Sequence, residues 1–418
     1  MEKVVIVGTG DYYYRFLAPC LKVMQENDLV DVVRTIDIRE KPFPNKDLFK
    51  SVEHKLREPS QNLSELVLDL KEQNPVVILG HANNLHTPDA KELVSHGFRV
   101  MIEKPYVVNK LQLKELSNLI KENPNHVALL EYHLMRKTIP LLMLDGLVKP
   151  DSFYFKSENI LRQKDFLEDS NDSMPDIKSL IGKPLSVQIK ILEAGSDIGK
   201  LDHRGSHLFD KKTGGGMIQD LGFHAVIPLF ALKDYLGDID KSFNHGSVRI
   251  ARCKEYFDLG VNLHKLPKEQ IAESYAEFSF LTSKKIPVQV LVGKYISDRE
   301  NQRRIKITGT KGSLYLDYHQ NVLYFSDNDE KRKDILELTN QKQIRYVPVI
   351  KTALEHLNNK NPFTIDYTSS LLDAQEFILN VVSKAGDLDF IHIHDTGEHA
   401  SDVFSGQKGG SVGLENTL

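Results

Sequence analysis

Three side chains that could act together on one substrate lie in two distant parts of this chain of 418 residues. Lys104 stands in the tripeptide Glu103-Lys104-Pro105, and Asp220 and His224 follow three consecutive glycines. An ammonium group can stabilise negative charge on a reacting oxygen, and an imidazole can exchange the proton of a hydroxyl group. We therefore predict Lys104, Asp220 and His224 as catalytic residues.

The spacing of Asp220 and His224 supports this prediction. The segment Met217 to Tyr235 has a helical pattern, and residues four apart on a helix lie on the same face, one turn from each other. The carboxylate can then hold the imidazole or share a substrate hydroxyl with it, while the glycines at 214–216 let the backbone pass close to a ligand. The alternative is a glycine-rich start of a helix with a capping histidine.

Lys104 follows an apolar run, residues 98–102, which predicts a buried strand. An isolated Glu-Lys-Pro sequence is explained equally well by a solvated lysine at the end of a strand. Its position after the fourth strand of a parallel type favours a side chain that points into the ligand crevice, because ligands bind at the carboxyl ends of parallel strands.

A glycine turn near the N-terminus predicts a dinucleotide site. Gly8-Thr9-Gly10 follows a strand at Val4 to Val7 and precedes a helix at Arg15 to Glu26, a context in which backbone N–H groups approach a pyrophosphate. Tyr13 stands where the fingerprint has a third small residue, and a plain strand-to-helix turn is the alternative. The predicted contacts of this turn with the cofactor come from Gly8, Thr9, Gly10, Asp11 and Tyr12.

Other predicted cofactor contacts come from the ends of neighbouring strands. Asp37 ends the second strand and can accept hydrogen bonds from an adenosine ribose, which favours NAD, whereas Arg39 can pair with the 2′-phosphate of NADP. A further strand, Val76 to Leu79, leads into the remaining predicted contacts, which are His81, Asn83 and His86, with Glu103 and Lys104. For His86 alone, a hydrogen-bonding role at the start of a helix is the alternative.

The first 130 residues alternate strands with helices, which predicts an α/β domain with a doubly wound parallel sheet. From the residue patterns we expect strands at Val4 to Val7, Val30 to Ile38, Val76 to Leu79, Arg99 to Ile102 and Val127 to Leu130, and helices at Arg15 to Glu26, Leu63 to Glu72, Pro88 to His96 and Lys110 to Glu122.

Residues 131–400 have a different pattern, which predicts a second, α+β domain. Strands follow one another there without long helices between them, which is typical of a large, mostly antiparallel sheet with one open face. Helices are expected only at Met217 to Tyr235 and Tyr367 to Ser383. The polar segment 151–180 is interpreted as a lid or a surface insertion, and residues 401–418 as a disordered tail. The expected strands are Leu185 to Glu193, Val248 to Ala251, Ser274 to Leu281, Pro287 to Gly293, Arg304 to Thr308, Ser313 to Asp317 and Val322 to Phe325.

Substrate contacts are expected mainly from this second domain. Arg204 can clamp a phosphate or carboxylate group. His203 and His207 have helical metal-ligand spacing, but without a carboxylate or cysteine partner we predict no metal site. His392-Ile393-His394 is interpreted as a strand. The predicted substrate-binding residues are Tyr132, His133, Arg136, Arg204, His207, Asp220 and His224.

The composition is that of a soluble globular protein, with 40% hydrophobic and 27% charged residues. A formal net charge of -4 does not suit a nucleic-acid surface. The chain starts in a strand rather than a signal peptide and has no apolar run of about twenty residues, so we predict no membrane contact and a cytoplasmic location. Cys20 and Cys253 are expected to be reduced.

The chain resembles the Gfo/Idh/MocA family of oxidoreductases, named for glucose-fructose oxidoreductase and inositol dehydrogenase. The resemblance covers residues 3 to about 317, where four segments occur in the family's order: VVIVGTG, VVILGHANNLHTPDAKELVSHGFRVMIEKP, GGGMIQDLGFHAVIPLF and ITGTKGSLYLD. It implies a Rossmann domain, an open-faced second domain that forms homodimers or homotetramers, and a bound NAD or NADP. Departures are Tyr13 in the glycine turn and His81-Ala82, where Thr-Pro is common.

The same resemblance implies a role for each matched residue. Lys104 would hydrogen-bond the reacting oxygen with support from Glu103, His224 would act as general acid and base, and Asp220 would orient the substrate or the histidine. Asn83 and His86 would line the nicotinamide side. The substrate would be a sugar, nucleotide sugar, cyclitol or related polyol, oxidised or reduced at a carbinol carbon. Alternatives are a glycosidase that oxidises its sugar transiently with tightly held NAD, and a cofactor-binding sugar sensor without turnover.

Overall fold

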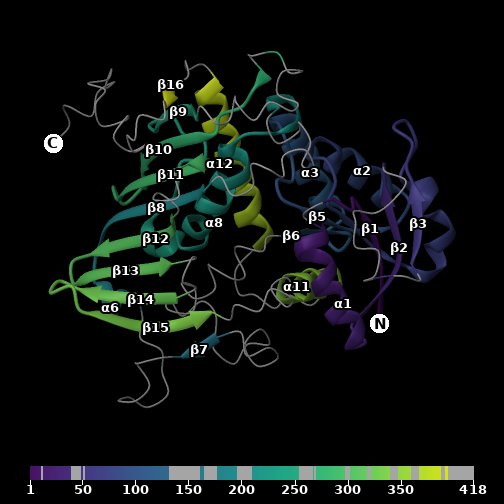
Figure 1. Ribbon diagram of the computed structural model, residues 1–418, viewed down its shortest axis with the longest axis horizontal. Helices are drawn as coiled ribbons and strands as arrows, with labels where there is room; N and C mark the ends of the chain where they lie inside the picture. The colour runs from purple at the N-terminus through teal and green to yellow at the C-terminus, as the bar shows by residue number, and fades with distance from the viewer. Residues whose placement is uncertain are drawn as a thin grey trace.

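The computed structural model contains two β-sheets, which the chain forms one after the other (Figure 1). The first sheet is built from the N-terminal 130 residues and the second from residues after 160. The structure describes residues 1–10, 13–38, 49, 52–130, 161–163, 177–194, 210–253, 267, 270–296, 302–317, 322–338, 347–358, 367–386 and 391–393.

The N-terminal sheet has six parallel strands in the order β3-β2-β1-β4-β5-β6. Its central strands are short runs of β-branched and other apolar residues with both faces buried, as a parallel sheet covered by helices requires. After β1 the chain adds β2 and β3 on one side and then β4, β5 and β6 on the other, so the strand order reverses between β1 and β4. A ligand crevice is expected at the carboxyl ends of the strands at such a point. The strands are β1 (Glu2–Val7), β2 (Val30–Asp37), β3 (Glu53–Leu56), β4 (Val76–Leu79), β5 (Arg99–Glu103) and β6 (Val127–Leu130).

Helices cover this sheet on both sides (Figure 1). The helix α1 (Ala18–Glu26), preceded by a π-helical turn at Tyr13–Leu17, contacts α11 (Val347–Leu357), while α2 (Asn83–Ser95) contacts α3 (Lys110–Glu122). Two short 3-10 helices, Ser64–Leu66 and Leu68–Gln73, precede β4. The doubly wound parallel sheet predicted from the sequence is therefore confirmed.

The second sheet has ten strands in the order β16-β9-β10-β11-β8-β12-β13-β14-β15-β7. Its pairs are antiparallel except β8 with β11 and β9 with β16, so the predicted mostly antiparallel sheet is confirmed. The strands are β7 (Leu161–Gln163), β8 (Pro184–Ala194), β9 (Ser247–Cys253), β10 (Tyr275–Leu281), β11 (Pro287–Ile296), β12 (Gln302–Gly309), β13 (Gly312–Asp317), β14 (Val322–Asp327), β15 (Arg332–Leu338) and β16 (Ile391–Ile393).

Two helices, α8 (Phe223–Ala231) and α12 (Tyr367–Gly386), pack together over one face of this sheet. Phe377 of α12 is fully buried at the centre of their packing. Four aromatic rings have centroids 4.9 to 6.3 Å from it, those of Phe230, Phe243, Phe278 and Phe280. Because each fully buried phenylalanine stabilises a fold by about 1.5–3 kcal/mol, this cluster fixes α8 firmly on the sheet. Shorter helices are α6 (Ile177–Ile181), a 3-10 turn at Lys211–Thr213, a π-helix at Ile218–Gly222 and α9 (Lys233–Leu236).

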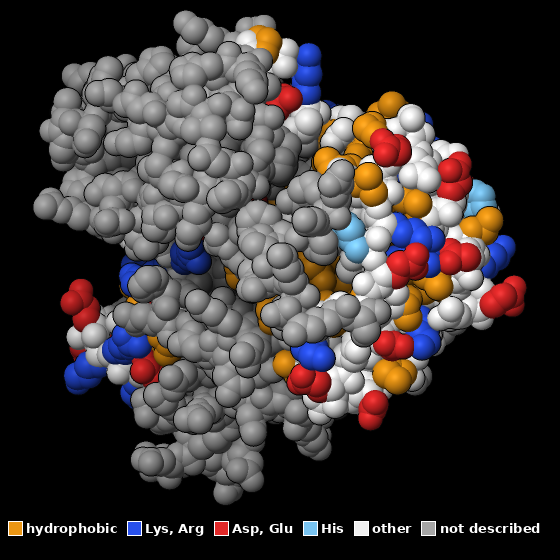
Figure 2. All heavy atoms as spheres, turned by 45° about the vertical axis from the view of Figure 1, so that its right-hand side comes forward, with side chains coloured by type: hydrophobic (Ala, Val, Ile, Leu, Met, Phe, Trp, Pro, Cys, Tyr) orange, Lys and Arg blue, Asp and Glu red, His pale blue; other side chains and the backbone are white. Residues whose placement is uncertain are grey.

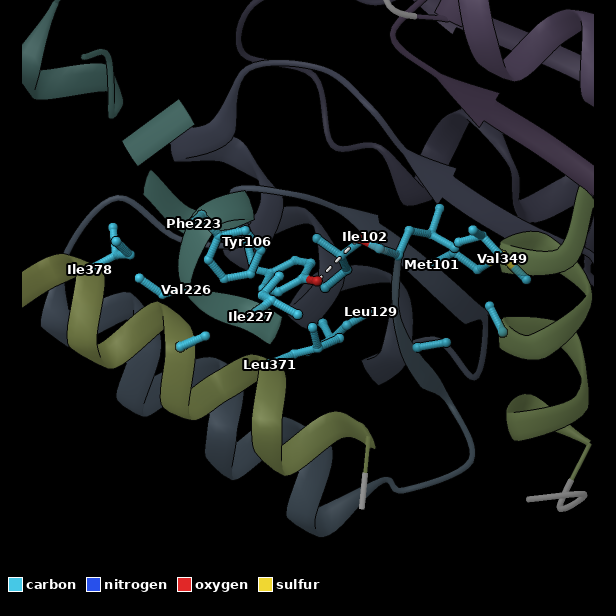
Figure 3. Packing of buried hydrophobic residues seen from close by; sticks show 14 of the residues in the cluster. Met101, Ile102, Tyr106, Leu129, Phe223, Val226, Ile227, Val349, Leu371 and Ile378 are labelled. Carbon is cyan, nitrogen blue, oxygen red and sulfur yellow. Dashed lines mark hydrogen bonds between the residues drawn. The ribbon is translucent and has the colours of Figure 1, made fainter. Parts of the chain in front are cut away.

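A shared core joins the two halves of the chain (Figure 3). Tyr106, which follows β5, is fully buried, and its ring packs edge-on against Phe223 at the start of α8 with 5.3 Å between centroids. Tyr106 also donates its hydroxyl to Leu130 O at 3.1 Å, and its backbone N–H to Gln375 Oε1 of α12 at 3.2 Å. The segment after Lys104 and the segment before His224 are thereby held against each other.

The C-terminal helices return to the N-terminal sheet. Helix α11 packs on β6, and Asn358 just beyond it bonds Arg99 and Glu2 at 3.0 and 3.2 Å. Helix α12 contacts α3 and β6. Helix α11 therefore packs with the first sheet although it lies late in the sequence.

Several elements do not appear among the predicted ones. Strand β3 is a short polar edge strand that pairs only with β2, and β15 begins with the charged residues Arg332 to Asp334. Neither has the apolar alternation by which strands are recognised. Within residues 151–180, the segment interpreted from the sequence as a lid or a surface insertion, Leu161–Gln163 extends the second sheet as β7 beside β15, and α6 begins at Ile177. The rest of 151–176 and the predicted tail 401–418 lie outside the described residues.

The surface shows no segregation of charge on the face drawn in Figure 2, where acidic and basic side chains of the described residues alternate over the N-terminal domain. Within the described ranges, no helix combines the length and apolar character needed to span a bilayer.

Candidate active site

Lys104 lies at the carboxyl edge of the first sheet, directly after β5. The carboxylate of Glu103, whose residue is 4% exposed, accepts the backbone N–H of Lys104, and the Lys104-Pro105 peptide bond is cis. The predicted support of Lys104 by Glu103 thus takes the form of a bond to its backbone. It orients the lysine while leaving the ammonium group to other partners.

The ammonium group of Lys104 meets a carboxylate from the other half of the chain. Its Nζ lies 2.7 Å from Oδ1 of Asp220, 116 residues away in sequence, and 3.4 Å from Asp220 O. Asp220 stands in the π-helix Ile218–Gly222, which leads straight into α8. Irregular helical turns of this kind are frequent at functional sites. The structure therefore brings together the lysine and the aspartate that the sequence predicted as catalytic.

A second lysine holds the other oxygen of the same carboxylate. Lys294 of β11 places its Nζ 2.5 Å from Oδ2 of Asp220. The side chains of Lys104, Asp220 and Lys294 are only 14, 21 and 12% exposed, so water screens these ion pairs weakly. Burial raises the pKa of Asp220, but the two lysines outweigh it and hold that pKa well below the ordinary value.

Lys294 was not predicted from the sequence, although a signal for it exists. The side chains of Val288, Val290 and Val292 point into the core, and alternation along β11 places Lys294 on that same face. A lysine at an inward position of a strand is unusual because its charge needs a partner there. Lys294 also forms an ion pair on the neighbouring strand β8, where Glu193 Oε2 lies 3.8 Å from Lys294 Nζ. Glu193 Oε1 in turn lies 3.1 Å from Nη2 of Arg303.

Replacing Lys294 by methionine is expected to raise the pH at which the protein loses activity and structure on acidification. The pKa of Asp220 is lowered in the folded state, so its ion pairs stabilise the fold above the unfolded pKa of about 4 and are lost as pH falls through the folded pKa. Without Lys294, Lys104 alone of the two lysines stabilises the ionised Asp220, so the pKa of Asp220 in the folded protein moves upward. Acid unfolding followed by circular dichroism, with kcat/KM measured over the same pH range, checks this.

Lys294→Arg serves as the conservative variant, since it keeps a cation beside Asp220. It should retain most of the wild-type acid profile. Acid-unfolding curves that superimpose for wild type and Lys294→Met would show that Lys294 does not control the ionisation of Asp220.

His224 is the second residue of α8 and is 6% exposed. Its ring centroid lies 6.4 Å from that of Phe223, which is anchored against Tyr106. One helical turn separates His224 from Asp220, as the sequence predicted. The two oxygens of Asp220, however, accept hydrogen bonds from the two lysines, so the contact that the structure shows for the carboxylate is with ammonium groups.

The glycines before Asp220 are needed for packing within the chain. Gly214 has φ +81°, and a Cβ atom on it would stand 2.5 Å from Val108 Cγ1. Gly216 has φ +113°, and a Cβ there would stand 2.6 Å from Oε1 of the buried Glu273, which accepts the N–H of Ile218 at 2.8 Å. A side chain at position 214 would push this turn away from Val108 of the N-terminal half, and one at position 216 would push it away from Glu273 of the second half.

The glycine turn after β1 is tightly fixed. Gly8 has φ +90°, and a Cβ atom on it would lie 2.7 Å from the backbone nitrogen of His81. Asp37 at the end of β2 accepts two hydrogen bonds at its Oδ2, from Thr9 N at 2.6 Å and Thr9 Oγ1 at 2.8 Å. Asp37 therefore braces the turn, a contact that the sequence did not predict beside its expected role at a ribose.

The carboxyl end of β4 carries two adjacent imidazoles. His81 Nε2 lies 2.6 Å from Oδ2 of Asp89, and His86 Nδ1 lies 3.0 Å from Pro105 O. Burial, with a smaller contribution from His81, lowers the pKa of His86 to about 3, so His86 is neutral near pH 7. Asn83 begins α2, and its Nδ2 would be 3.7 Å from a Cβ on Gly214. The predicted cofactor residues thus border the same edge as Lys104.

Comparison with known proteins identifies the first part of the chain. Residues 2–130 match the sequence model of the Gfo/Idh/MocA family, described as "Oxidoreductase family, NAD-binding Rossmann fold". This match agrees with the resemblance to the Gfo/Idh/MocA family that the sequence motifs indicated, and it shows an NAD-binding Rossmann domain of an oxidoreductase type over residues 2–130. None of the curated proteins matches the sequence.

Solved structures share the fold over nearly the whole chain. KijD10, a 3-ketoreductase from Actinomadura kijaniata in complex with NADP and TDP-benzene, is 13% identical, with a TM-score of 0.63, and the match covers 94% of this chain and 99% of that one. GenD2 from gentamicin A biosynthesis, in complex with NAD, is 15% identical with a TM-score of 0.63, covering 92% and 94%. Biliverdin reductase from Synechocystis sp. PCC 6803 is 13% identical with a TM-score of 0.60, covering 92% and 99%.

The described residues fit the dinucleotide that this Gfo/Idh/MocA domain implies. The glycine turn, Asp37 and Lys104 border the crevice at the carboxyl ends of the parallel strands. Two buried ring nitrogens at the same edge, His81 Nδ1 and His86 Nε2, have no hydrogen-bond partner in the part of the chain that the structure describes. A buried polar atom without a protein partner calls for an explanation, and a bound ligand at this edge would supply one.

Several predicted site residues lie outside the described residues. For the cofactor these are Asp11, Tyr12 and Arg39. For the substrate they are Tyr132, His133, Arg136, Arg204 and His207.

Proposed function

We propose that this protein is an NAD(P)-dependent oxidoreductase that interconverts a carbinol and a carbonyl group on a sugar, nucleotide sugar, cyclitol or related polyol. The observation that carries the proposal is the 2.7 Å contact of Lys104 with Asp220, at the edge of the sheet where the glycine turn also lies. A lysine that directly follows a strand of the first sheet and a carboxylate of the π-helix before α8 meet there beside the expected dinucleotide crevice. Lys104, Asp220 and His224 are the proposed catalytic residues.

Lys104 stabilises the reacting oxygen in this proposal. Its ammonium group is oriented by the Glu103 bond to its backbone and by Asp220, so it is preorganised toward developing negative charge. Asp220 in turn is fixed by Lys294, which limits its freedom to follow Lys104. A bound nicotinamide would supply the hydride chemistry, and the residues of the chain orient the substrate and handle the proton.

His224 exchanges the hydroxyl proton of the substrate in this proposal. It lies one turn from Asp220 on a helix start that Tyr106 and Phe223 anchor against the N-terminal domain. An imidazole that is largely buried and rigidly placed can act as general base in oxidation and as general acid in reduction.

The substrate class is supported by two of the similar structures. KijD10 is a 3-ketoreductase crystallised with TDP-benzene, and GenD2 comes from gentamicin A biosynthesis. A biliverdin reductase has the same fold, so the fold alone does not select a carbinol substrate. The pairing of Lys104 with His224 that we propose favours a carbonyl-to-carbinol interconversion, because that reaction needs both oxyanion stabilisation and a proton.

NAD is the preferred cofactor in this proposal, because Asp37 stands at the end of β2, where a carboxylate suits a free ribose diol; NADP is the alternative. Titration with NADH and NADPH, followed by a screen of sugars, nucleotide sugars and inositols for a change in nicotinamide absorbance, tests the proposal. Net formation of NADH separates a dehydrogenase from a glycosidase that oxidises its sugar transiently. A protein that binds neither NADH nor NADPH would refute the proposed function.

We also propose that the protein forms a homodimer or homotetramer, which light scattering would test.

A further inference from the structure

A chain of three buried polar side chains runs along the carboxyl edge of the N-terminal sheet. Arg57 donates to both oxygens of Asp89, at 2.5 and 2.8 Å, and His81 Nε2 lies 2.6 Å from Asp89 Oδ2. The side chains of Arg57, Asp89 and His81 are 12, 5 and 13% exposed. The backbone N–H of Arg57 bonds Asp37 O at 2.8 Å, which ties this chain to the end of β2. None of these hydrogen bonds involves the proposed catalytic residues Lys104, Asp220 and His224.

The chain fixes the hydrogen-bonding character of His81. Burial raises the pKa of Asp89, but the hydrogen bonds from His81 and Arg57 have the larger combined effect and hold the pKa below its ordinary value. The carboxylate is therefore ionised and can only accept hydrogen bonds. Nε2 of His81 therefore carries a hydrogen. In the neutral ring Nδ1 is then the nitrogen with the lone pair, and this atom is buried without a partner among the described residues.

His86 also has one bonded and one unpartnered ring nitrogen within the described ranges, but here Nδ1 is bonded and Nε2 is unpartnered. Its Nδ1 donates to Pro105 O, because a carbonyl oxygen can only accept. The ring is neutral near pH 7, since its pKa is lowered to about 3, and its Nε2 is likewise a buried acceptor without a partner in the described part of the chain. The two ring centroids are 5.2 Å apart. The edge thus offers two neighbouring acceptors and calls for a ligand with hydrogen-bond donors.

The position of these rings indicates which part of a dinucleotide would meet them. The backbone of His81 touches the glycine turn, where the Cβ position of Gly8 lies 2.7 Å from His81 N. His86 is bonded to Pro105, the neighbour of Lys104. The imidazoles therefore lie between the turn expected to bind phosphates and the lysine expected to face the reacting carbon.

We propose that Arg57, Asp89 and His81 form a positioning relay for the nicotinamide nucleoside half of the bound cofactor. His81 Nδ1 accepts a hydrogen bond from that half, from a ribose hydroxyl or the carboxamide N–H. Arg57 and Asp89 touch no ligand and act by holding the tautomer and orientation of the ring. The proposal rests on the nicotinamide-dependent function proposed above. It gives a specific role to His81, which the sequence predicted only as a cofactor contact, and a role to Arg57 and Asp89, which the sequence did not single out.

Isothermal titration with NADH and with ADP tests the relay, because ADP lacks the nicotinamide half. His81→Leu is expected to bind NADH about five- to tenfold more weakly while binding ADP as wild type does, as for the loss of one hydrogen bond. His81→Asn should keep most of the NADH affinity, since its amide oxygen can stand near the place of Nδ1. His96→Leu, at an exposed histidine on the other end of α2, is the matched control.

Asp89→Asn provides a second variant that keeps His81. An amide can donate to Nε2, which moves the hydrogen of the ring to Nδ1, so NADH affinity should fall while ADP affinity is retained. Thermal melts verify that each variant is folded. Unchanged NADH affinity in both His81→Leu and Asp89→Asn would overturn the relay. Equal loss of NADH and ADP affinity would also overturn it, because His81 would then only support the glycine turn. Wild type that binds neither NADH nor NADPH would instead refute the proposed function.

Discussion

Lys104→Met is expected to lower kcat about a thousandfold, and to weaken NADH binding by no more than about tenfold, the loss expected for one contact. The ammonium group of Lys104 is the one cation that β5 delivers to Asp220, at 2.7 Å, and methionine keeps the length of the side chain without its charge. Loss of one preorganised donor to a developing oxyanion costs about 10²–10³ in kcat, and loss of a full charge at a largely buried site lies at the upper end of that range. Steady-state kinetics on the substrate found in the screen, with NADH titration in parallel, gives both numbers.

Lys110→Met is the matched control, because Lys110 is an exposed lysine of α3 in the same domain. It should behave as wild type in both measurements. If Lys104→Met retained kcat within about tenfold of wild type, Lys104 would not contact the reacting oxygen. A sensor without turnover would give a third pattern, in which wild type binds the sugar and NADH but neither protein shows a change in nicotinamide absorbance.

His224→Asn is expected to lower kcat by two to four orders of magnitude, the range found for loss of a general acid or base, about 10²–10⁴. Asparagine preserves a polar side chain in a position that is 6% exposed, so the helix start should remain packed through Phe223 and Tyr106. The rate of hydride transfer in a single turnover, measured by stopped-flow absorbance, reports the loss directly. NADH affinity is expected to remain close to that of wild type.

His245→Asn is the control for this variant, because His245 is exposed in the same half of the chain. A double variant with Lys104→Met tests whether the two residues act on one transition state. Effects of residues that work as a unit are far from additive, so the double variant should lose little more than the worse single variant. Fully additive losses would indicate that Lys104 and His224 serve separate steps.

The strands of the first sheet and the place of Lys104 were predictable from the sequence. Val76–Leu79, Val127–Leu130 and Lys110–Glu122 have the predicted bounds, because buried parallel strands and amphipathic helices leave strong local patterns. Strand β3 and helix α11 were not predicted. The residues of β3 are mostly polar at the edge of the sheet, and the place of α11 depends on contacts with β6 and α1 that its own sequence does not encode.

The candidate site divides in the same way. A glycine turn after a strand, a lysine at a strand end and an aspartate four residues before a histidine are all local features. They carried the resemblance to the Gfo/Idh/MocA family and the choice of Lys104, Asp220 and His224. Lys294 was not predicted, because the expected strand ended at Gly293. Alternation along β11 would have put it on the inward side, but nothing local shows that its partner is Asp220, 74 residues away.

The sequence by itself therefore determined the strongly patterned elements and the residue types at their ends, because periods of two and 3.6 residues depend only on neighbours in the chain. Only the tertiary structure decided the partners: Lys294 on Asp220, Thr9 on Asp37, and Arg57 with His81 on Asp89. Those pairs join strands and helices distant in sequence. They form when packing of the buried core, such as Tyr106 against Phe223, closes the chain and brings charged groups where only a partner makes their burial favourable.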